Sequence, residues 1–167
     1  MGKIKQLDPI TINKIAAGEV IDRPASIIKE LLENGIDANA TQIKIIIENG
    51  GKKRIKITDN GDGIEKEDLP LVPIQHATSK IKQLEDIYIT DTFGFRGEAI
   101  ASISHISQLN ITSKTKEGQT AYKLTAKNNL ISEIKPCQHP QGTTIEVLDL
   151  FHEIPVRLRF LKTDQTE

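Results

Sequence analysis

Apolar residues recur at helical spacing near the start of the chain. Asp8-Pro9 supplies a start signal, and the apolar residues that follow it predict a first short helix that ends at Gly18. Arg23-Pro24 predicts the start of a second helix, with the proline near its first position and Gly35 near its end. The apolar stripe of this second helix consists of Ile27, Ile28, Leu31 and Leu32. The stripe indicates that one side of the helix packs against a core.

The spacing then becomes alternating, which is typical of strands. Isoleucines alternate partly with polar residues over Gln42–Glu48 and Lys53–Thr58. Between these two runs, Asn49-Gly50-Gly51 is a strong turn signal, so we expect an antiparallel hairpin.

The middle of the chain is less regular. A helical stretch is expected after Gly63, and Pro70 and Pro73 shorten it. The segment from about Thr78 to Gly94 has no clear period, which suggests a long functional loop. A further helix is predicted over Gly97–Ile103.

Three or four more strands and a last helix complete the predicted fold. The strands are expected at Leu109–Lys114, Thr120–Ala126, Ile131–Lys135 and Thr143–Leu148, and Pro155 starts a short helix toward Leu161. Short turns between these strands suit hairpins rather than βαβ crossovers. The pattern predicts an α/β two-layer sandwich (an α+β fold), with helices on one face of a mainly antiparallel mixed sheet. Without a repeat or linker, residues 1–167 are expected to form a single domain.

Composition narrows the class of protein without identifying it. The net charge of −1 supplies no global attraction to nucleic acid, so DNA would have to meet a local basic patch. Candidates for that patch are Lys52-Lys53-Arg54, Lys56, Arg157, Arg159 and Lys162, although a solvated face is the more common role of such charges. Cys137 is the only cysteine, and no Cys/His cluster suggests a transition-metal site. With neither a signal peptide nor an apolar run of membrane length, we expect a soluble cytoplasmic protein.

A first cluster of polar residues lies on the second predicted helix. At about 100° per residue, Glu30, Asn34 and Asp37 share one face. An amide oxygen suits a loosely held Mg²⁺, and a carboxylate one turn away suits activation of a water molecule. The alternative is the wet face of an amphipathic helix, which the helix alone favours.

A second cluster directly follows the second predicted strand. In Asp59-Asn60-Gly61-Asp62-Gly63, the glycines allow the backbone to pass close to a flat ring, and Asp59 can accept a hydrogen bond from the amine of adenine. A calcium loop is excluded, because with Gly63 at its sixth position Thr58 and Leu69 would occupy positions that need carboxylates. A plain turn remains an equal alternative for this cluster.

A third cluster, Gly94-Phe95-Arg96-Gly97-Glu98, opens a predicted helix. Backbone N–H groups at such a start attract phosphate oxygens. The cluster is neither a P-loop nor a dinucleotide fingerprint. Upstream, Thr78-Ser79-Lys80 adds two hydroxyls and an ammonium group that reach phosphates if the loop folds over. Taken alone, Lys80 is better explained as a surface lysine.

Taken together, these clusters resemble the N-terminal ATPase of the MutL family of DNA mismatch repair proteins. That family belongs to a larger group (GHKL, or Bergerat type) with gyrase B, Hsp90 and the histidine kinases. The matching segments are Ile15-Ala-Ala-Gly-Glu-Val20, Arg23-Pro-Ala25, Lys29-Glu-Leu31, Glu33-Asn34, Asp37-Ala38, Asp59-Asn-Gly61, Gly63-Ile64, His76-Ala-Thr-Ser-Lys-Ile81, Gly94-Phe-Arg-Gly-Glu-Ala99, Ala101-Ser-Ile103, Gly142-Thr-Thr144 and Asp149-Leu-Phe151. The His76–Ile81 segment is more typical of bacterial members.

The resemblance implies a role for each residue of the predicted site. Glu30 is implied as the general base and Asn34 as the Mg²⁺ ligand, while Asp59 contacts adenine. The full set of nucleotide contacts is implied to be Asn34, Asp37, Ala38, Asp59, Gly63, Thr78, Ser79, Lys80, Gly94, Phe95, Arg96, Gly97 and Thr143 or Thr144. The implied cofactors are ATP and Mg²⁺. The implied partners are a second copy bound through the ATP-loaded domain, other repair proteins including the mismatch-recognition protein, and DNA without sequence preference, but no membrane.

The chain also departs from the family pattern. Asn39 stands where the family usually has glycine, and His152-Glu-Ile-Pro-Val-Arg157 replaces an aromatic-Asn-Thr-Pro-Ala-Arg segment. Family members continue into a second domain, which supplies a lysine to the γ-phosphate, and into a C-terminal dimerisation domain. We therefore expect residues 1–167 to be a fragment that binds ATP weakly and turns it over poorly or not at all. The alternative to an ATPase is a nucleotide-gated binding module with little or no hydrolysis.

Overall fold

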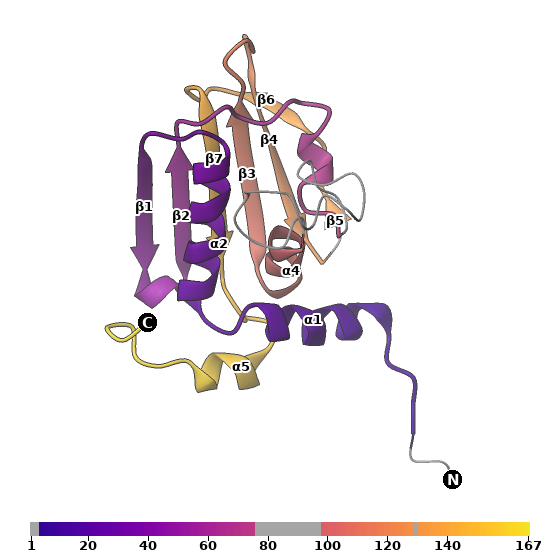
Figure 1. The fold of residues 1–167 in the computed structure, drawn as a ribbon. Coiled ribbons are helices and arrows are strands. Elements are labelled where there is room, and N and C mark those ends of the chain that lie inside the picture. The colour runs from indigo at the N-terminus through magenta and orange to yellow at the C-terminus, as the bar shows by residue number, and fades with distance from the viewer. Residues whose placement is uncertain (1–3, 76–97, 129) are drawn as a thin grey trace, which may run out of the picture.

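The protein consists of one open sheet with helices on one side. The computed structural model describes residues 4–75, 98–128 and 130–167 (Figure 1). Its strands lie in the order β1-β2-β7-β3-β4, and both β5 and β6 pair with β4. Every strand pair among the described residues is antiparallel. The predicted fold class, helices on one face of a mainly antiparallel sheet, is therefore confirmed.

The two N-terminal helices begin where the sequence predicts. Helix α1 spans Pro9–Val20, and the side chain of Asp8 caps it by accepting the Thr11 N–H at 2.9 Å. The predicted end at Gly18 is wrong by two residues, because Gly18 is a buried helical residue whose carbonyl accepts a hydrogen bond from the Arg157 guanidinium at 2.7 Å. Helix α2 spans Pro24–Asp37 and buries the side chains of Ile27 and Leu31.

The predicted hairpin is confirmed with small changes in its bounds. Strand β1 spans Ile43–Glu48, β2 spans Arg54–Asp59, and the short 3₁₀ turn η1 (Asn49–Gly51) joins them. Strand β7, Gly142–Leu148, lies in the middle of the sheet, where it pairs with both β2 and β3 (Gln108–Lys114). Strand β4 spans Ala121–Lys127.

The single strand predicted over Ile131–Lys135 is wrong. The structure has two short strands, β5 (Leu130–Ile131) and β6 (Lys135–Cys137). Ile131 pairs with Ala126 and Lys135 with Lys123, so this side has one more residue than β4 between the two pairs. The Ser132 hydroxyl accepts the Thr125 N–H at 2.9 Å, which replaces a regular ladder bond and produces a bulge.

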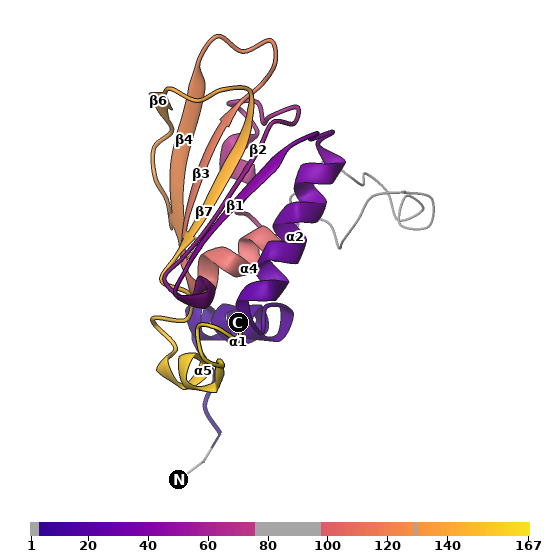
Figure 2. The same ribbon diagram turned by 90° about the vertical axis from the view of Figure 1, so that its left-hand side faces the viewer.

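The remaining helices are short. Pro70 lies within the 3₁₀ turn η2 (Leu69–Leu71), in agreement with a shortened helical stretch. Helix α4 spans Ala99–Ile106, later than the predicted Gly97–Ile103, and α5 spans Pro155–Phe160. Figure 2 shows α2 and α4 on the same side of the sheet, with α1 and α5 beyond its lower end. The core lies between the sheet and these helices.

The alternation of side chains gives the sheet an inner and an outer face. Ile57, Ile111 and Ile145 point inward to the helices and are buried. On the outer face Glu146 accepts hydrogen bonds from Arg54 at 2.7 Å and from Asn110 at 3.1 Å. The register of the strands therefore shows which face each side chain belongs to. Only side chains on the inner face can join the residues of α2 in one site.

Glu153, at a position where the family pattern has asparagine, links three parts of the chain. Its carboxylate contacts Lys127 at 2.7 Å and Lys14 at 2.6 Å, and it accepts a hydrogen bond from Asn128 at 3.1 Å. The bonds from Lys127 and then Lys14 and Asn128 lower the pKa of Glu153 to about 2. This departure thus joins α1 to the end of β4 and leaves the predicted nucleotide site untouched.

Candidate functional site

The best-defined polar group of the predicted site is the carboxylate of Asp59. Asp59 is the last residue of β2 and is half-buried. Its Oδ1 atom accepts hydrogen bonds from the backbone N–H of Gly61 at 2.9 Å and of Thr143 at 3.2 Å. No described residue donates to its Oδ2 atom. The side chain is thus oriented by two backbone groups and presents a second oxygen as an acceptor.

Helix α2 packs closely against this end of β2. Gly35 is buried, and a Cβ atom added to it would lie 3.0 Å from the Cδ1 atom of Ile43 and 3.6 Å from the Cβ atom of Asp59. A larger residue would push the helix away from the strand. The absence of a side chain at Gly35 therefore brings the neighbouring Asn34 to the same region as Asp59. The sequence pattern had identified Gly35 only as a residue near the helix end.

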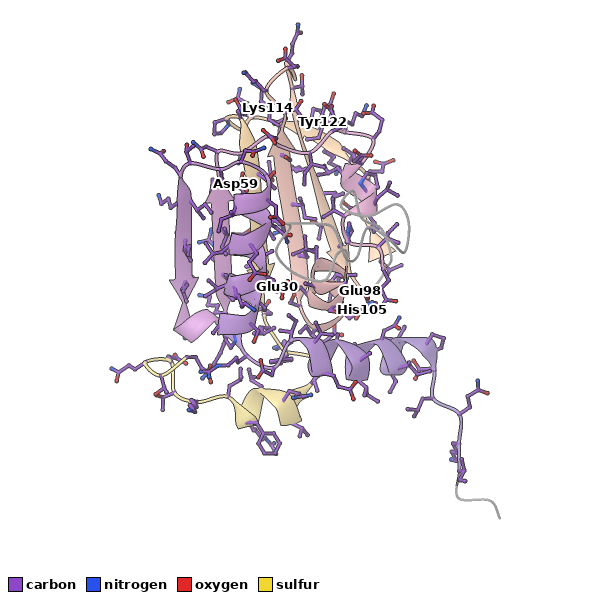
Figure 3. All side chains as sticks on the ribbon, in the orientation of Figure 1. Glu30, Asp59, Glu98, His105, Lys114 and Tyr122 are labelled. Carbon is purple, nitrogen blue, oxygen red and sulfur yellow. The ribbon has the colours of Figure 1, made fainter. Side chains whose placement is uncertain are left out.

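The predicted stripe of polar residues lies on a continuous helix. Glu30, Asn34 and Asp37 all belong to α2, and each is partly exposed. In Figure 3 Glu30 lies beside the lower half of α2, and Asp59 lies near its upper end. Both acidic residues therefore belong to the helix-covered side of the sheet, as a shared site requires.

The loop after Asp59 is anchored to the C-terminal end of α2. The Asp62 N–H donates to the carbonyl of Ala38 at 2.8 Å, and the Asn39 side chain donates to the Asp62 carboxylate at 2.7 Å. Asn39 has φ +60°, a left-handed conformation that asparagine adopts more readily than most residues. Asn39 thus keeps the backbone conformation that suits the glycine of the family pattern, and it adds a bond to the loop.

Gly63 is required by a close approach between two segments. Its φ is +78°, and an added Cβ atom would lie 2.2 Å from the carbonyl oxygen of Lys114 at the end of β3. The described contact of Gly63 is therefore with the backbone of Lys114, and this contact by itself requires a glycine. The expected approach of Gly63 to a base stays a prediction.

The structure distinguishes between the two candidate threonines of β7. Thr143 lies on the inner face with Asp59, and its hydroxyl is 2.8 Å from that of Ser113. Thr144 lies on the outer face, where its hydroxyl is 2.9 Å from that of Thr58 and 2.7 Å from the Nε2 atom of His139. The sheet alternation thus brings Thr143 to Asp59 and directs Thr144 to the opposite face, which favours Thr143 of the two, and the nucleotide contact itself stays a prediction.

Two residues to which the sequence patterns assigned no role support the site. Ser113 is buried and joins β3 to β7 and to the backbone of Ile64. Asn60 accepts the N–H groups of Thr41 and Gln42 through its side-chain oxygen, at 2.9 and 2.8 Å, and so holds β1 to the loop. The Asn-Gly pair at 60–61 signals a turn, but no sequence pattern predicts which backbone groups its side chain reaches.

The third cluster lies outside the described residues. Thr78, Ser79, Lys80, Gly94, Phe95, Arg96 and Gly97 belong to the span 76–97, so their predicted contacts with phosphate remain predictions. The described part of the chain resumes at Glu98, directly before α4.

Three of the seven residues of the candidate basic patch, Lys52, Lys53 and Arg54, contact acidic side chains. Arg54 contacts Glu48 and Glu146, at 3.0 and 2.7 Å. Lys52 contacts Asp164 at 3.0 Å. These pairs lower the net positive charge that the segment offers to a phosphate backbone. The structure therefore does not strengthen this segment as a DNA-binding patch.

The donor set of α2 suits a metal that is shared with a nucleotide. No group of three or more His, Cys, Asp or Glu side chains that would cage a metal occurs among the described residues. Mg²⁺ typically keeps several waters and takes few protein ligands beside substrate phosphates. The amide oxygen of Asn34, near a carboxylate one turn away, fits that mode of binding.

As for membranes, none of the described helices combines the length and apolar content that a span requires.

Comparisons with known proteins agree with this arrangement. A family profile described as "Histidine kinase-, DNA gyrase B-, and HSP90-like ATPase" matches residues 22–154. The DNA mismatch repair protein MutL of Dichelobacter nodosus is 53% identical over 167 residues, which are 100% of this chain and 28% of that protein. MutL of Escherichia coli is 53% identical over 165 residues, covering 98% of this chain and 27% of that protein. The chain thus spans just over a quarter of the length of these relatives.

Solved structures show the same fold. The N-terminal domain of a DNA repair protein superimposes with a TM-score of 0.76 at 37% identity, covering 92% of this chain and 45% of that one. The MutL ATPase domain of Aquifex aeolicus complexed with ADP gives a TM-score of 0.68 at 31% identity, covering 88% of this chain and 50% of that one.

Proposed function

Because the chain belongs to the histidine kinase-, DNA gyrase B- and HSP90-like ATPases, in the branch of the MutL mismatch repair proteins, we propose that it binds ATP with Mg²⁺. The site lies on the inner side of the sheet, between α2 and the adjoining ends of β2 and β7. The base is placed near Asp59, and the phosphates extend along α2 toward Asn34.

The observation that carries this proposal is the orientation of Asp59. Two backbone N–H groups hold its Oδ1 atom, and its Oδ2 atom stays available as an acceptor on the face that α2 covers. An amino group on a base edge is the donor that this oxygen suits. Thr143 contributes a second polar side chain on the same face of the sheet, and Ala38 accepts the Asp62 N–H in the loop that also contains Gly63.

For the phosphate end, we assign Asn34 as the metal ligand and Glu30 as the general base. When bound, Mg²⁺ neutralises phosphate charge and polarises the γ-phosphoryl group. Glu30, one turn from Asn34, takes the proton of the attacking water. Asp37 supports this polar face of the helix. The residues Thr78, Ser79, Lys80, Gly94, Phe95, Arg96 and Gly97 are assigned to a lid over the triphosphate.

The role of a longer protein that contains this domain is a further part of the proposal. ATP binding there favours self-association through this domain, and the paired form engages DNA and other repair proteins. The relatives named above, DNA mismatch repair proteins, support a place in mismatch repair. The described surface does not single out a DNA contact.

The second candidate is a nucleotide-gated binding module with little or no hydrolysis in residues 1–167. It concerns residues 1–167 tested by themselves, which correspond to just over a quarter of the length of the relatives. A second domain is implied to supply a lysine to the γ-phosphate, and without that cation the transition state is less stabilised. We therefore propose that residues 1–167 alone bind nucleotide and hydrolyse it slowly.

Calorimetric titration of the 167-residue chain with ADP, with and without Mg²⁺, tests nucleotide binding directly. Saturable binding with one site, strengthened by Mg²⁺, supports the proposal. An absence of binding up to millimolar ADP would overturn it. The same titration is repeated with an ATP analogue that resists hydrolysis. If Mg²⁺ raises the affinity for this analogue more than it raises the affinity for ADP, the result supports placing the metal at the phosphate end.

A further inference from the structure

Ser113 joins three segments beside Asp59 through one buried hydroxyl group. Its side chain, 1% exposed, lies on the inner face of β3. Its Oγ atom accepts the Ile64 N–H at 2.8 Å, donates to the Gly142 carbonyl at 3.1 Å, and lies 2.8 Å from the Thr143 hydroxyl. Thr143 in turn donates its backbone N–H to Asp59. A single residue, Thr143, therefore links the hydroxyl of Ser113 to the Asp59 carboxylate, which we assign to the base.

The direction of each hydrogen bond follows from the chemistry of the groups. A hydroxyl group has one hydrogen and two lone pairs. The Ile64 N–H can only donate, and the Gly142 carbonyl can only accept, so Ser113 uses one lone pair and its hydrogen on these two groups. Its remaining lone pair then accepts the hydroxyl hydrogen of Thr143. The hydrogen and both lone pairs of the Ser113 hydroxyl group then have a partner, as is usual for buried polar groups.

The consequence concerns the Thr143 hydroxyl. Because its hydrogen is directed to Ser113, its lone pairs are what it offers to a ligand on the inner face. Asp59 also offers a lone pair there, through Oδ2. Both residues lie on the inner face of neighbouring strands, so we place the two acceptors at one edge of the base, where they fit a donor such as the amino group at position 6 of adenine. A 6-keto purine has an oxygen at this position instead. The two acceptors of the protein then face a third acceptor, and no hydrogen is present to form a hydrogen bond.

We propose that Ser113 is a specificity-determining residue, which fixes the Thr143 hydroxyl as an acceptor and so excludes 6-keto purine nucleotides. The proposal rests on the proposed function, since it concerns the base that the Asp59 site takes. Ser113 acts through Thr143 and is a positioning residue. Its role differs from a purely structural one, because it changes the ratio of two affinities rather than both affinities equally.

The test compares ADP with IDP, whose bases differ at position 6 and in the protonation of the neighbouring nitrogen. For the wild-type chain, calorimetry is expected to give tighter binding of ADP. In Ser113→Ala the Thr143 hydroxyl is free to rotate and donate to the keto oxygen, so the Kd ratio of IDP to ADP is expected to fall about tenfold. Thr143→Val, which leaves the bonds of Ser113 to Ile64 and Gly142 in place, is expected to lower the same ratio by removing the acceptor.

Two controls separate this effect from a loss of structure. Ser113→Thr keeps the hydroxyl group and is expected to keep the ratio, and Thr112→Ala changes the outer face of the same strand and is also expected to keep it. An unchanged ratio in either Ser113→Ala or Thr143→Val would overturn the inference while leaving nucleotide binding intact. If Ser113→Ala does not fold, Thr143→Val alone decides. A wild-type chain that binds neither nucleotide would instead overturn the proposed function.

Discussion

The backbone N–H of Thr143 donates a hydrogen bond to the Oδ1 atom of Asp59, with 3.2 Å between the two atoms. This contact joins residues that are far apart in the sequence, because β2 and β7 are neighbours in the sheet. It adds to the bond from the Gly61 N–H and leaves one carboxylate oxygen toward the ligand side. The predicted properties of the site depend on this orientation.

Asp59→Asn tests the acceptor role of that oxygen. The amide replaces one carboxylate oxygen by an NH₂ group, which cannot accept a hydrogen bond. Either the bonds from the two backbone N–H groups or the bond from the base is therefore lost. We expect ADP to bind about 10- to 100-fold more weakly, as measured by calorimetry. Asp68→Asn makes the same chemical change at an exposed position and is expected to leave the affinity unchanged. Equal affinities for wild type and Asp59→Asn would remove Asp59 from the site.

Glu30→Ala tests the assignment of the general base. Removal of the carboxylate is expected to lower steady-state phosphate release by at least about 100-fold, or to background if wild-type turnover is already slow. Binding of ATP is expected to persist, because Glu30 acts on water rather than on the nucleotide. Glu33→Gln alters a carboxylate on the same helix and is expected to retain turnover. If wild type and Glu30→Ala release phosphate equally, residues 1–167 act as a binding module.

Asn39 offers a test of stability near the site. Its φ of +60° is unfavourable for alanine, so we expect Asn39→Ala to lower the free energy of unfolding by about 1–2 kcal/mol. Asn39→Gly fits the backbone conformation and loses only the bond to Asp62, so the cost is expected to stay below about 1 kcal/mol. Urea unfolding of both variants measures the difference. A smaller cost for alanine than for glycine would contradict the importance of this backbone conformation.

His105 provides a test of pH dependence. It is 2% exposed in α4, and neither ring nitrogen has a hydrogen-bond partner in the described structure. Burial, with a contribution from the charge of Lys14, lowers the pKa of His105 below its ordinary value of 6.5. The unfolded chain therefore binds the proton more readily than the folded one. The stability that the neutral ring permits is fully present above pH 6.5 and is lost as the pH falls below it.

His105→Leu is expected to remove this dependence. The substitution also removes an unpaired buried polar group, so we expect the free energy of unfolding to rise by about 1 kcal/mol at neutral pH and by more near pH about 5.5. Urea unfolding at both pH values is the measurement, and His152→Leu, at an exposed position, serves as the control. A constant difference between wild type and His105→Leu at the two pH values would show that the histidine does not titrate in this way.

Local signals in the sequence predicted most elements of the fold. Asp8-Pro9 and Pro24 marked two helix starts, and Asn49-Gly50-Gly51 marked the hairpin, because these residues restrict the backbone wherever they occur. The errors arose where contacts from elsewhere decided the outcome. Gly18 remains helical under Arg157, and the expected strand Ile131–Lys135 is divided because Ser132 bonds to β4.

By itself the sequence determined the types of residue that a nucleotide site needs and the helical spacing of Glu30 and Asn34, because residues within one helix share a face at a known period. Only the tertiary structure decided which groups join them. The antiparallel pairing of β2 with β7 directs Thr143 toward Asp59 and Thr144 away from it, and a one-residue shift of register would exchange the two. Ser113 became part of the site for the same reason, since strand pairing sets distances that no local pattern encodes.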